Sequence, residues 1–220
     1  MQDYTQTDPW RVFRIMAEFV EGFDELSNLG PAVSVFGSAQ STPEDPYYEQ
    51  AVKLGRLLAL NGFAVVTGGG PGIMQAANKG ANEAGGVSVG LNIELPEVQT
   101  PNQYVTKLLS FRYFFVRKLM FSKHSIAFVV FPGGFGTLDE MFEALTLVQT
   151  DRIGKASFPV CLFGAEYWEP LLSWLRDGLL SRGYISAEDL QLFSLTDSEE
   201  DAVEIIKTQY DRDGVSRLEP

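Results

Sequence analysis

Short apolar runs alternate along the chain with longer stretches of helical periodicity. The runs are rich in Val, Ile and Phe, and most end at glycine. Several are apolar at nearly every position, which is typical of strands that a parallel sheet buries on both faces. We predict strands at 33–39, 63–69, 87–95, 125–133, 158–164 and 191–195.

The stretches between these runs have the length and spacing of helices. We predict helices at 46–61, 72–84, 105–123, 138–150, 166–181 and 198–210, and one more at 9–28 before the first strand. This alternation predicts an α/β fold, a Rossmann-like, doubly wound and mostly parallel sheet flanked by helices. No internal repeat or long linker divides the chain, so we expect a single domain over 1–220.

In a sheet of this kind, ligands bind beyond the carboxyl ends of the strands, near the point where the strand order reverses. Small residues follow three of the predicted strands, as Gly37-Ser38-Ala39, TGGGPG from Thr67 and PGGFGT from Pro132. Glycine lets a ligand approach the backbone and permits a positive φ. The TGGGPG loop lacks the last glycine of a dinucleotide fingerprint, and PGGFGT is not a P-loop.

The segment PGGFGTLDE leads from a strand into a helix, and backbone N–H groups at a helix N-terminus favour an anion. We predict that Gly133, Gly134, Gly136 and Thr137 hold a phosphate; a tight turn without a ligand is the alternative. Thr137 and Glu140 also have the spacing of a capping box, which would give Glu140 a structural role instead of a chemical one, or both.

The net charge of −12 makes a general nucleic-acid surface improbable on electrostatic grounds, and we expect no nucleic-acid partner. The charge is uneven, because no acid occurs between Glu97 and Asp139. The basic residues in this stretch are Lys107, Arg112, Arg117, Lys118 and Lys123. They favour either a small anionic ligand or ion pairs with acids elsewhere. We expect Asp139 and Glu143 to be solvated.

The predicted helix over 105–123 has apolar residues on every side and should therefore be mostly buried. Arg117 lies among its aromatic residues, and an unpaired buried charge is very unfavourable. Its partner is expected to be a carboxylate such as Glu140, or the phosphate of a ligand. The flanking phenylalanines either pack in the core or line a flat pocket for a base.

Composition excludes other classes of protein. One cysteine, Cys161, in an apolar run predicts a buried thiol in a reducing, cytoplasmic compartment. The single histidine, His124, cannot form a multi-histidine metal site, and we interpret it as a polar residue at a helix end. No apolar window is long enough to span a membrane, so we expect no membrane partner.

The combination of PGGFGTLDE, FVRK just upstream and GGGPGIM earlier resembles the Lonely Guy (LOG) family of nucleotide phosphoribohydrolases, often mislabelled lysine decarboxylases. PGGFGTLDE fits the family pattern PGGxGTxxE in full. The resemblance spans about 30–180, and the predicted helices at 9–28 and 198–210 lie outside that core.

The resemblance implies hydrolysis of the N-glycosidic bond of adenine-type nucleoside 5′-monophosphates, AMP or cytokinin riboside 5′-monophosphates, to free base and ribose 5-phosphate. It implies Arg117 and Glu140 as the catalytic pair, without metal or cofactor, in a homodimer or higher homo-oligomer. Binding of phosphate and substrate would fall to Gly133, Gly134, Gly136, Thr137, Lys118, Gly37, Ser38, Gly70 and Gly72. We expect Glu140 to stabilise the ribosyl cation and orient water, and Arg117 to keep Glu140 ionised.

The chain departs from the family at one point. Many members have the pattern MHxRK, whereas this chain has FFVRK over 114–118, without the histidine. The base preference is therefore open, and AMP is the more secure substrate. A non-catalytic carrier of a nucleotide or a molybdopterin-type phosphorylated cofactor is the main rival, and a single-stranded DNA binder is disfavoured by the charge. A lysine decarboxylase would need a pyridoxal phosphate lysine; Lys118 and Lys123 are available, but nothing else fits such a site.

Overall fold

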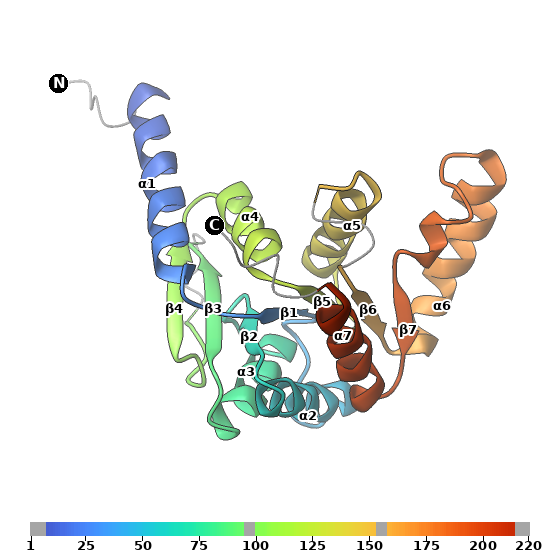
Figure 1. Cartoon of the computed structure of the whole chain (residues 1–220), viewed down its shortest axis with the longest axis horizontal. Helices are drawn as coiled ribbons and strands as arrows, with labels where there is room; N and C mark the ends of the chain where they lie inside the picture. Colours follow the sequence, from blue (N-terminus) through green and yellow to red (C-terminus); the bar gives the residue numbers. More distant parts are fainter. Residues whose placement is uncertain (1–7, 95–99, 153–157, 214–220) are drawn as a thin grey trace.

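The computed structural model describes residues 8–94, 100–152 and 158–213, and its centre is a seven-stranded sheet with the order β4-β3-β2-β1-β5-β6-β7 (Figure 1). All pairings between these strands are parallel. The strands are β1 Ala32–Phe36, β2 Ala64–Thr67, β3 Ser88–Ile93, β4 Lys107–Phe111, β5 Ala127–Val130, β6 Val160–Phe163 and β7 Ser194–Thr196. The chain builds outward from β1 to β4, then returns to the other side of β1 with β5, so the strand order reverses between β1 and β5.

Helices cover both faces of the sheet (Figure 1). One face carries α1 Asp8–Leu26, α4 Phe114–His124, α5 Phe135–Gln149 and α6 Ala165–Trp174. The other carries α2 Pro46–Leu60, α3 Ile73–Glu83 and α7 Glu199–Asp213. After α6 the chain continues through a π-helical turn, Leu175–Leu179, and short 3₁₀ turns before β7. The α/β, doubly wound prediction is confirmed.

The core consists of two apolar layers, one on each side of the sheet. Alternate residues of β1 point to opposite layers: Val33 and Val35 pack under α2, α3 and α7, whereas Ala32 and Phe36 pack under α1, α4, α5 and α6. Both sets are buried, which explains why the central strands are apolar at nearly every position.

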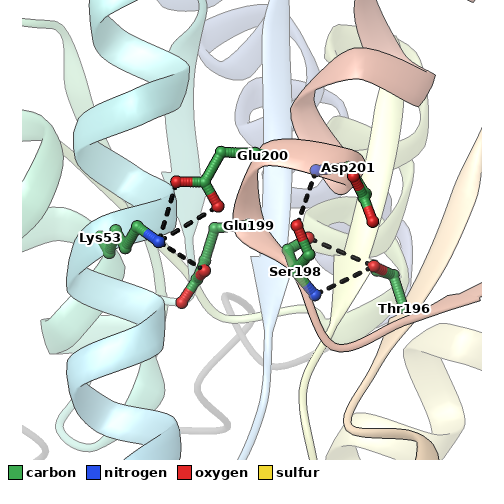
Figure 2. Close-up of polar contacts among 6 residues, drawn as sticks. All are labelled: Lys53, Thr196, Ser198, Glu199, Glu200 and Asp201. Carbon is green, nitrogen blue, oxygen red and sulfur yellow. Dashed lines mark hydrogen bonds and ion pairs between the residues drawn. The ribbon is translucent and has the colours of Figure 1, made fainter.

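Ion pairs connect the C-terminal helix α7 to α2, and a side chain caps the N-terminus of α7. Figure 2 shows Lys53 Nζ of α2 between two carboxylates of α7, 3.0 Å from Glu199 and 2.8 Å from Glu200. Ser198 caps the helix, because its Oγ accepts the Asp201 N–H at 3.1 Å, and its own N–H donates to Thr196 Oγ1 at 3.1 Å.

Helix α1 packs against α4. The Glu18 carboxylate accepts the backbone N–H of Arg112 at 3.1 Å and of Tyr113 at 3.3 Å, just where α4 begins. Tyr113 is the N-cap of α4 and makes no side-chain cap of its own. Farther along, Phe19 of α1 lies 6.4 Å from Phe115 of α4, measured between ring centroids. A carboxylate from another helix thus serves as the cap that α4 lacks.

The predicted helix at 105–123 is wrong in its first part. Lys107–Phe111 forms β4, at the edge of the sheet, and α4 begins only at Phe114. The helix is also less buried than expected, because Phe114 and Phe115 are about half exposed. The other predicted elements are found at or near their expected positions; Leu95, the last residue of the predicted strand 87–95, lies outside the described residues.

Cys161 is fully buried in β6 as a free thiol, and burial raises its pKa to about 12. His124 is the last residue of α4, as expected for a polar residue at a helix end. Burial, with a smaller contribution from Lys123, lowers the His124 pKa to about 4, so the imidazole is neutral at physiological pH. Among the described helices, none has the length and apolar character needed to cross a membrane.

Candidate active site

A cavity of about 390 Å³ lies at the carboxyl ends of the strands where the strand order reverses. The segments after β1, β2 and β5 meet there, and α4 and α5 form the rest of the wall. The lining residues are Phe36, Gly37, Ser38, Ala39, Gln40, Gly68, Met74, Ile93, Phe114, Arg117, Phe121, Gly134, Gly136, Thr137 and Glu140. The position is the one at which an open α/β sheet binds its ligand, and the volume suits a small molecule.

The glycine turn after β5 leads directly into α5. Gly134 is the N-cap and Phe135 the first helical residue, with no acid in the first turn. The first N–H groups of a helix have no intrahelical acceptor, so this end of α5 presents donors and a positive dipole to the cavity. An anion placed here would be stabilised by both.

None of the three glycines of this turn has a positive φ, which corrects the sequence interpretation, and only Gly133 is required for space. Gly133, Gly134 and Gly136 are absent from the positive-φ residues. A Cβ on Gly133 would lie 2.2 Å from Thr137 Oγ1 and 2.9 Å from the Ser38 nitrogen. In contrast, a Cβ on Gly134 or Gly136 would meet no described atom within 4 Å. Protein packing therefore does not demand glycine at these two cavity-lining positions.

The predicted capping box is not formed. Because α5 begins at Phe135, Thr137 and Glu140 are helical residues, and no side chain caps the helix. Both are buried, with exposed fractions of 6% and 7%, and both line the cavity. Glu140 is therefore a buried acid facing a cavity, and the cap no longer explains it.

Arg117 of α4 is the counter-charge of Glu140. The distance from Arg117 Nη2 to Glu140 Oε1 is 3.7 Å, and both side chains are largely buried. The Arg117 Nε is buried without a hydrogen-bond partner among the described residues. The guanidinium carbon lies 5.3 Å from the ring centre of Phe114 and 5.8 Å from that of Phe121. Of the two partners expected for Arg117, the carboxylate is the one observed.

Glu140 has a strongly shifted pKa. Burial raises it to about 7, and the charges of Lys118 and Arg117 oppose this rise without cancelling it. Burial also lowers the pKa of Arg117, while Glu140 acts in the opposite direction. Arg117 acts on the Glu140 pKa in the expected direction, but desolvation is the larger effect. A carboxyl that titrates near neutrality is suited to proton transfer.

Most of the basic island is paired with acids outside the cavity. Lys107 pairs with Glu25 at 3.0 Å and Arg112 with Glu94 at 3.0 Å. Lys118 pairs with Asp139 at 2.9 Å and also with Glu143. Asp139 is exposed to solvent as expected, whereas Glu143 is only partly exposed, and both carboxylates also join α5 to α4 through Lys118. Of the five basic residues, Arg117 is the one that lines the cavity.

Part of the cavity wall, beside Arg117, is apolar and partly aromatic. Phe36 and Phe121 contact each other edge to face, with centroids 5.0 Å apart, and Phe114, Met74 and Ile93 extend this surface. The cavity thus combines a flat apolar side with a donor-rich end.

The structure brings together many of the predicted site residues but not all. Gly37, Ser38, Gly134, Gly136, Thr137, Arg117 and Glu140 line the cavity; Gly70, Gly72, Gly133 and Lys118 do not. Gly72, at φ +68°, is needed for close packing, since a Cβ there would lie 2.2 Å from the Ser38 carbonyl oxygen. The Gly70 carbonyl accepts a hydrogen bond from Asn102. Gly133 shapes the turn, and Lys118 is held by two carboxylates.

Sequence reasoning missed Phe36, Gln40, Met74 and Ile93 as lining residues, whereas Ala39, Gly68 and Phe121 belong to segments that it had singled out. Phe36 and Ile93 end strands, so strand-end position was a usable signal. No group of three or more possible His, Cys, Asp or Glu metal ligands occurs within the described residues. The fold and the cavity together define an α/β protein with a cavity at the point where the strand order reverses, next to a buried carboxyl group and the N-terminus of α5.

Residues 74–206 match the family model described as "Possible lysine decarboxylase". The chain belongs to this family, which includes the LOG proteins. Neither Lys118 nor Lys123, the two lysines considered for a pyridoxal phosphate site, lines the cavity.

Two relatives are similar over most of their length. The chain is 30% identical over 166 residues to cytokinin riboside 5′-monophosphate phosphoribohydrolase LOG4 of Arabidopsis thaliana, covering 73% of this chain and 74% of that protein. It is 30% identical over 177 residues to the cytokinin riboside 5′-monophosphate phosphoribohydrolase of Mycobacterium tuberculosis, covering 78% and 90%. Among solved structures, the molybdenum cofactor binding protein from Rippkaea orientalis is similar with a TM-score of 0.58 and 27% identity, covering 81% of this chain and 96% of that one.

Proposed function

We propose that this protein hydrolyses the N-glycosidic bond of adenine-type nucleoside 5′-monophosphates, releasing free base and ribose 5-phosphate. The observation that carries the proposal is the buried Arg117–Glu140 pair in a cavity that the N-terminus of α5 also lines. The relatives named as phosphoribohydrolases support the same reaction class.

The cavity has a place for each part of the substrate. The 5′-phosphate would bind the N–H groups at the start of α5, in the space left open by Gly134 and Gly136. The base would lie on the apolar side formed by Phe36, Phe114 and Phe121. The ribose would then lie between these ends, with its C1′ near Glu140.

In the reaction the C1′–N9 bond breaks, its electron pair leaves with the base, and water oxygen forms a new bond to C1′. Positive charge develops on the ribose as the bond breaks, as in glycoside hydrolysis. Glu140 in its carboxylate form would stabilise this charge and accept a proton from the attacking water. The departing base takes up one proton, and Glu140 returns to the carboxylate by releasing the proton it received, so the overall reaction consumes one water and is balanced. Arg117 would orient Glu140, and phosphate binding would fix the sugar.

The base specificity is the finer part of the proposal. The relatives are named for cytokinin riboside 5′-monophosphates, but this chain has Phe115 where many members have histidine. Phe115 is about half exposed and does not line the cavity, whereas its neighbour Phe114 does. We expect AMP to be cleaved. The rates of base release from AMP and from isopentenyl-adenosine monophosphate will show which substrate is preferred.

The test is base release from AMP, GMP, CMP and isopentenyl-adenosine monophosphate, followed by chromatography. Glu140→Gln keeps the shape of the side chain but cannot accept a proton from water. It should lower adenine release by roughly 10²–10⁴-fold. Glu83→Gln is the matched control, because Glu83 is a half-exposed residue of α3, paired with Lys79 and outside the cavity. Turnover of Glu140→Gln within about tenfold of wild type would contradict the assigned role.

A non-catalytic carrier of a nucleotide or a molybdopterin-type phosphorylated cofactor is the second candidate. It is favoured by the likeness to the molybdenum cofactor binding protein, whose chain matches almost end to end. Tight binding of such a ligand with no base release from any nucleotide would select the carrier.

We also propose that the protein is a homodimer or higher homo-oligomer. Large apolar side chains are exposed on three helices of one face of the sheet (Figure 1): Trp10, Val12, Phe13, Met16 and Val20 on α1, Phe114, Phe115 and Leu119 on α4, and Phe135 and Phe142 on α5. Such a concentration is unusual for a monomer. Light scattering of wild type and Leu119→Glu should show a lower mass for the variant; a wild-type mass equal to 24.4 kDa would refute the proposal.

A further inference from the structure

The glycine turn after β5 is held from outside the cavity by Tyr167. The Tyr167 hydroxyl donates a hydrogen bond to the Gly133 carbonyl oxygen at 2.6 Å. Tyr167 belongs to the first turn of α6, which follows β6, and β6 is the parallel neighbour of β5. The start of α6 and the turn after β5 therefore lie at the same edge of the sheet.

This hydrogen bond determines the direction of the next N–H group. The Gly133 carbonyl and the Gly134 N–H belong to one peptide unit, and the described chain contains no cis peptide. In a trans peptide the C=O and N–H point in opposite directions. With the carbonyl directed at Tyr167 on α6, the N–H of Gly134, a cavity-lining residue, is directed away from α6.

The preceding carbonyl is held in a similar way. The Ser38 N–H donates to the Pro132 carbonyl oxygen at 2.9 Å, and Ser38 itself lines the cavity. Two successive carbonyls of the turn thus have partners, one from the loop after β1 and one from α6. A carbonyl oxygen turned into an anion site would repel the ligand, whereas aligned N–H groups attract it.

Tyr167 is presented by a firmly anchored segment. The next residue, Trp168, is fully buried and donates from Nε1 to the Phe163 carbonyl at 2.9 Å. The Ala165 N–H donates to the Asp197 carboxylate at 2.8 Å. Gly164, at φ +96°, allows the sharp entry into α6, and a Cβ there would lie 2.9 Å from the Tyr47 ring. The hydroxyl of Tyr167 is thereby placed by the fold and not by the ligand.

We propose that Tyr167 is a positioning residue for the phosphate group: it orients the Gly133–Gly134 peptide so that the turn accepts an anion. Tyr167 does not line the cavity, so it acts through the turn and not by contact with the ligand. The inference rests on one part of the proposed function, namely that this turn binds the phosphate of the substrate. It adds a specific consequence, because loss of the hydroxyl should weaken recognition of the phosphate and leave recognition of the base intact.

The experiment compares Tyr167→Phe with wild type, using Tyr184→Phe as control; Tyr184 is 74% exposed and outside the cavity. Calorimetry gives Kd for ribose 5-phosphate, inorganic phosphate and adenine, and base release gives KM and kcat for AMP. Loss of one hydrogen bond should raise Kd for ribose 5-phosphate and KM for AMP about fivefold. The kcat, the Kd for adenine and the constants of Tyr184→Phe should stay within about twofold, and Tm within about 4 °C.

An equal loss for adenine and ribose 5-phosphate would overturn the inference, as would an unchanged Kd for ribose 5-phosphate or the failure of wild type to bind either anion. The proposed hydrolytic function can be refuted independently of this inference. If no nucleotide is cleaved but Tyr167→Phe still weakens ribose 5-phosphate selectively, the positioning role stands and the hydrolase does not.

Discussion

Arg117 and Glu140 face each other at 3.7 Å, a separation too long for a hydrogen bond. This distance accounts for the unusual titration of Glu140. A cation in direct hydrogen-bond contact would hold the carboxyl ionised, whereas at this distance burial dominates and the pKa is raised to about 7. Glu140 can therefore gain or lose a proton near neutral pH, whereas Arg117 remains charged beside it.

The rate of base release should depend on pH through Glu140. If the carboxylate is the active form, kcat/KM rises with pH and levels off above an apparent pKa of about 7. The substrate phosphate titrates near pH 6, so AMP cleavage should be followed from pH 5 to 9. A rate that falls through pH 7 would show that the protonated acid is the active form.

Lys118 should tune this pH dependence without contacting the substrate. Its charge is the first of the effects that lower the Glu140 pKa, and it also neutralises Asp139 and Glu143, which raise it. Lys118→Met should therefore shift the midpoint of the pH–rate profile upward and lower the rate at pH 7. Lys123→Met is the control on the same helix, since Lys123 contacts Phe23. Coincident midpoints for Lys118→Met and wild type would exclude this electrostatic role.

The same titration should appear in stability. The Glu140 pKa is raised from 4.5 to about 7 on folding, so its favourable contribution is complete below pH 4.5 and is lost as pH rises through 7. Glu140→Gln does not titrate. Urea unfolding from pH 4.5 to 8 should show the stability of wild type falling relative to the variant by up to about 3 kcal/mol. Parallel stability profiles for the two proteins would be inconsistent with the raised pKa.

Glu18 should stabilise α4 from outside that helix. Glu18→Ala removes the carboxylate that accepts the N–H groups of Arg112 and Tyr113, and should lower stability by about 1 kcal/mol. That loss corresponds to a Tm lower by roughly 2–4 °C for a chain of this size. Glu18→Gln, which retains an acceptor, should lose less. Glu21→Ala, at an exposed position of α1, serves as control; an equal effect would argue against capping.

The central sheet was predictable because its strands are apolar on both faces. Val33 and Val35 pack into one apolar layer, and Ala32 and Phe36 pack into the other, so the strand is apolar at nearly every position. The edge strand β4 was not predictable in this way. It buries Leu109 and Phe111 on one side and exposes Leu108 and Ser110 on the other, and no glycine or proline separates it from α4. Because its alternation of buried and exposed residues is short, the segment was predicted as the first part of a helix.

The site was predictable where it is local in sequence. The glycine turn and Glu140 lie in one segment, so their proximity could be inferred from PGGFGTLDE alone. Contacts between segments far apart in the sequence, such as Tyr167 with Gly133 or Lys107 with Glu25, could not be inferred in this way. The role of the basic island stayed open between a ligand and ion pairs for the same reason, since the acids that pair with Lys107 and Arg112 come from other parts of the chain.

The burial of Cys161 has a practical consequence. It is the sole cysteine of the chain, fully enclosed, with a thiol that stays protonated at any ordinary pH. A cysteine introduced on the surface would then be the one reactive thiol available for attaching a fluorophore. Phe135 stands between the cavity-lining Gly134 and Gly136 and is 92% exposed. A dye attached at Phe135→Cys would report ligand entry by its emission, in a protein whose native thiol needs no removal.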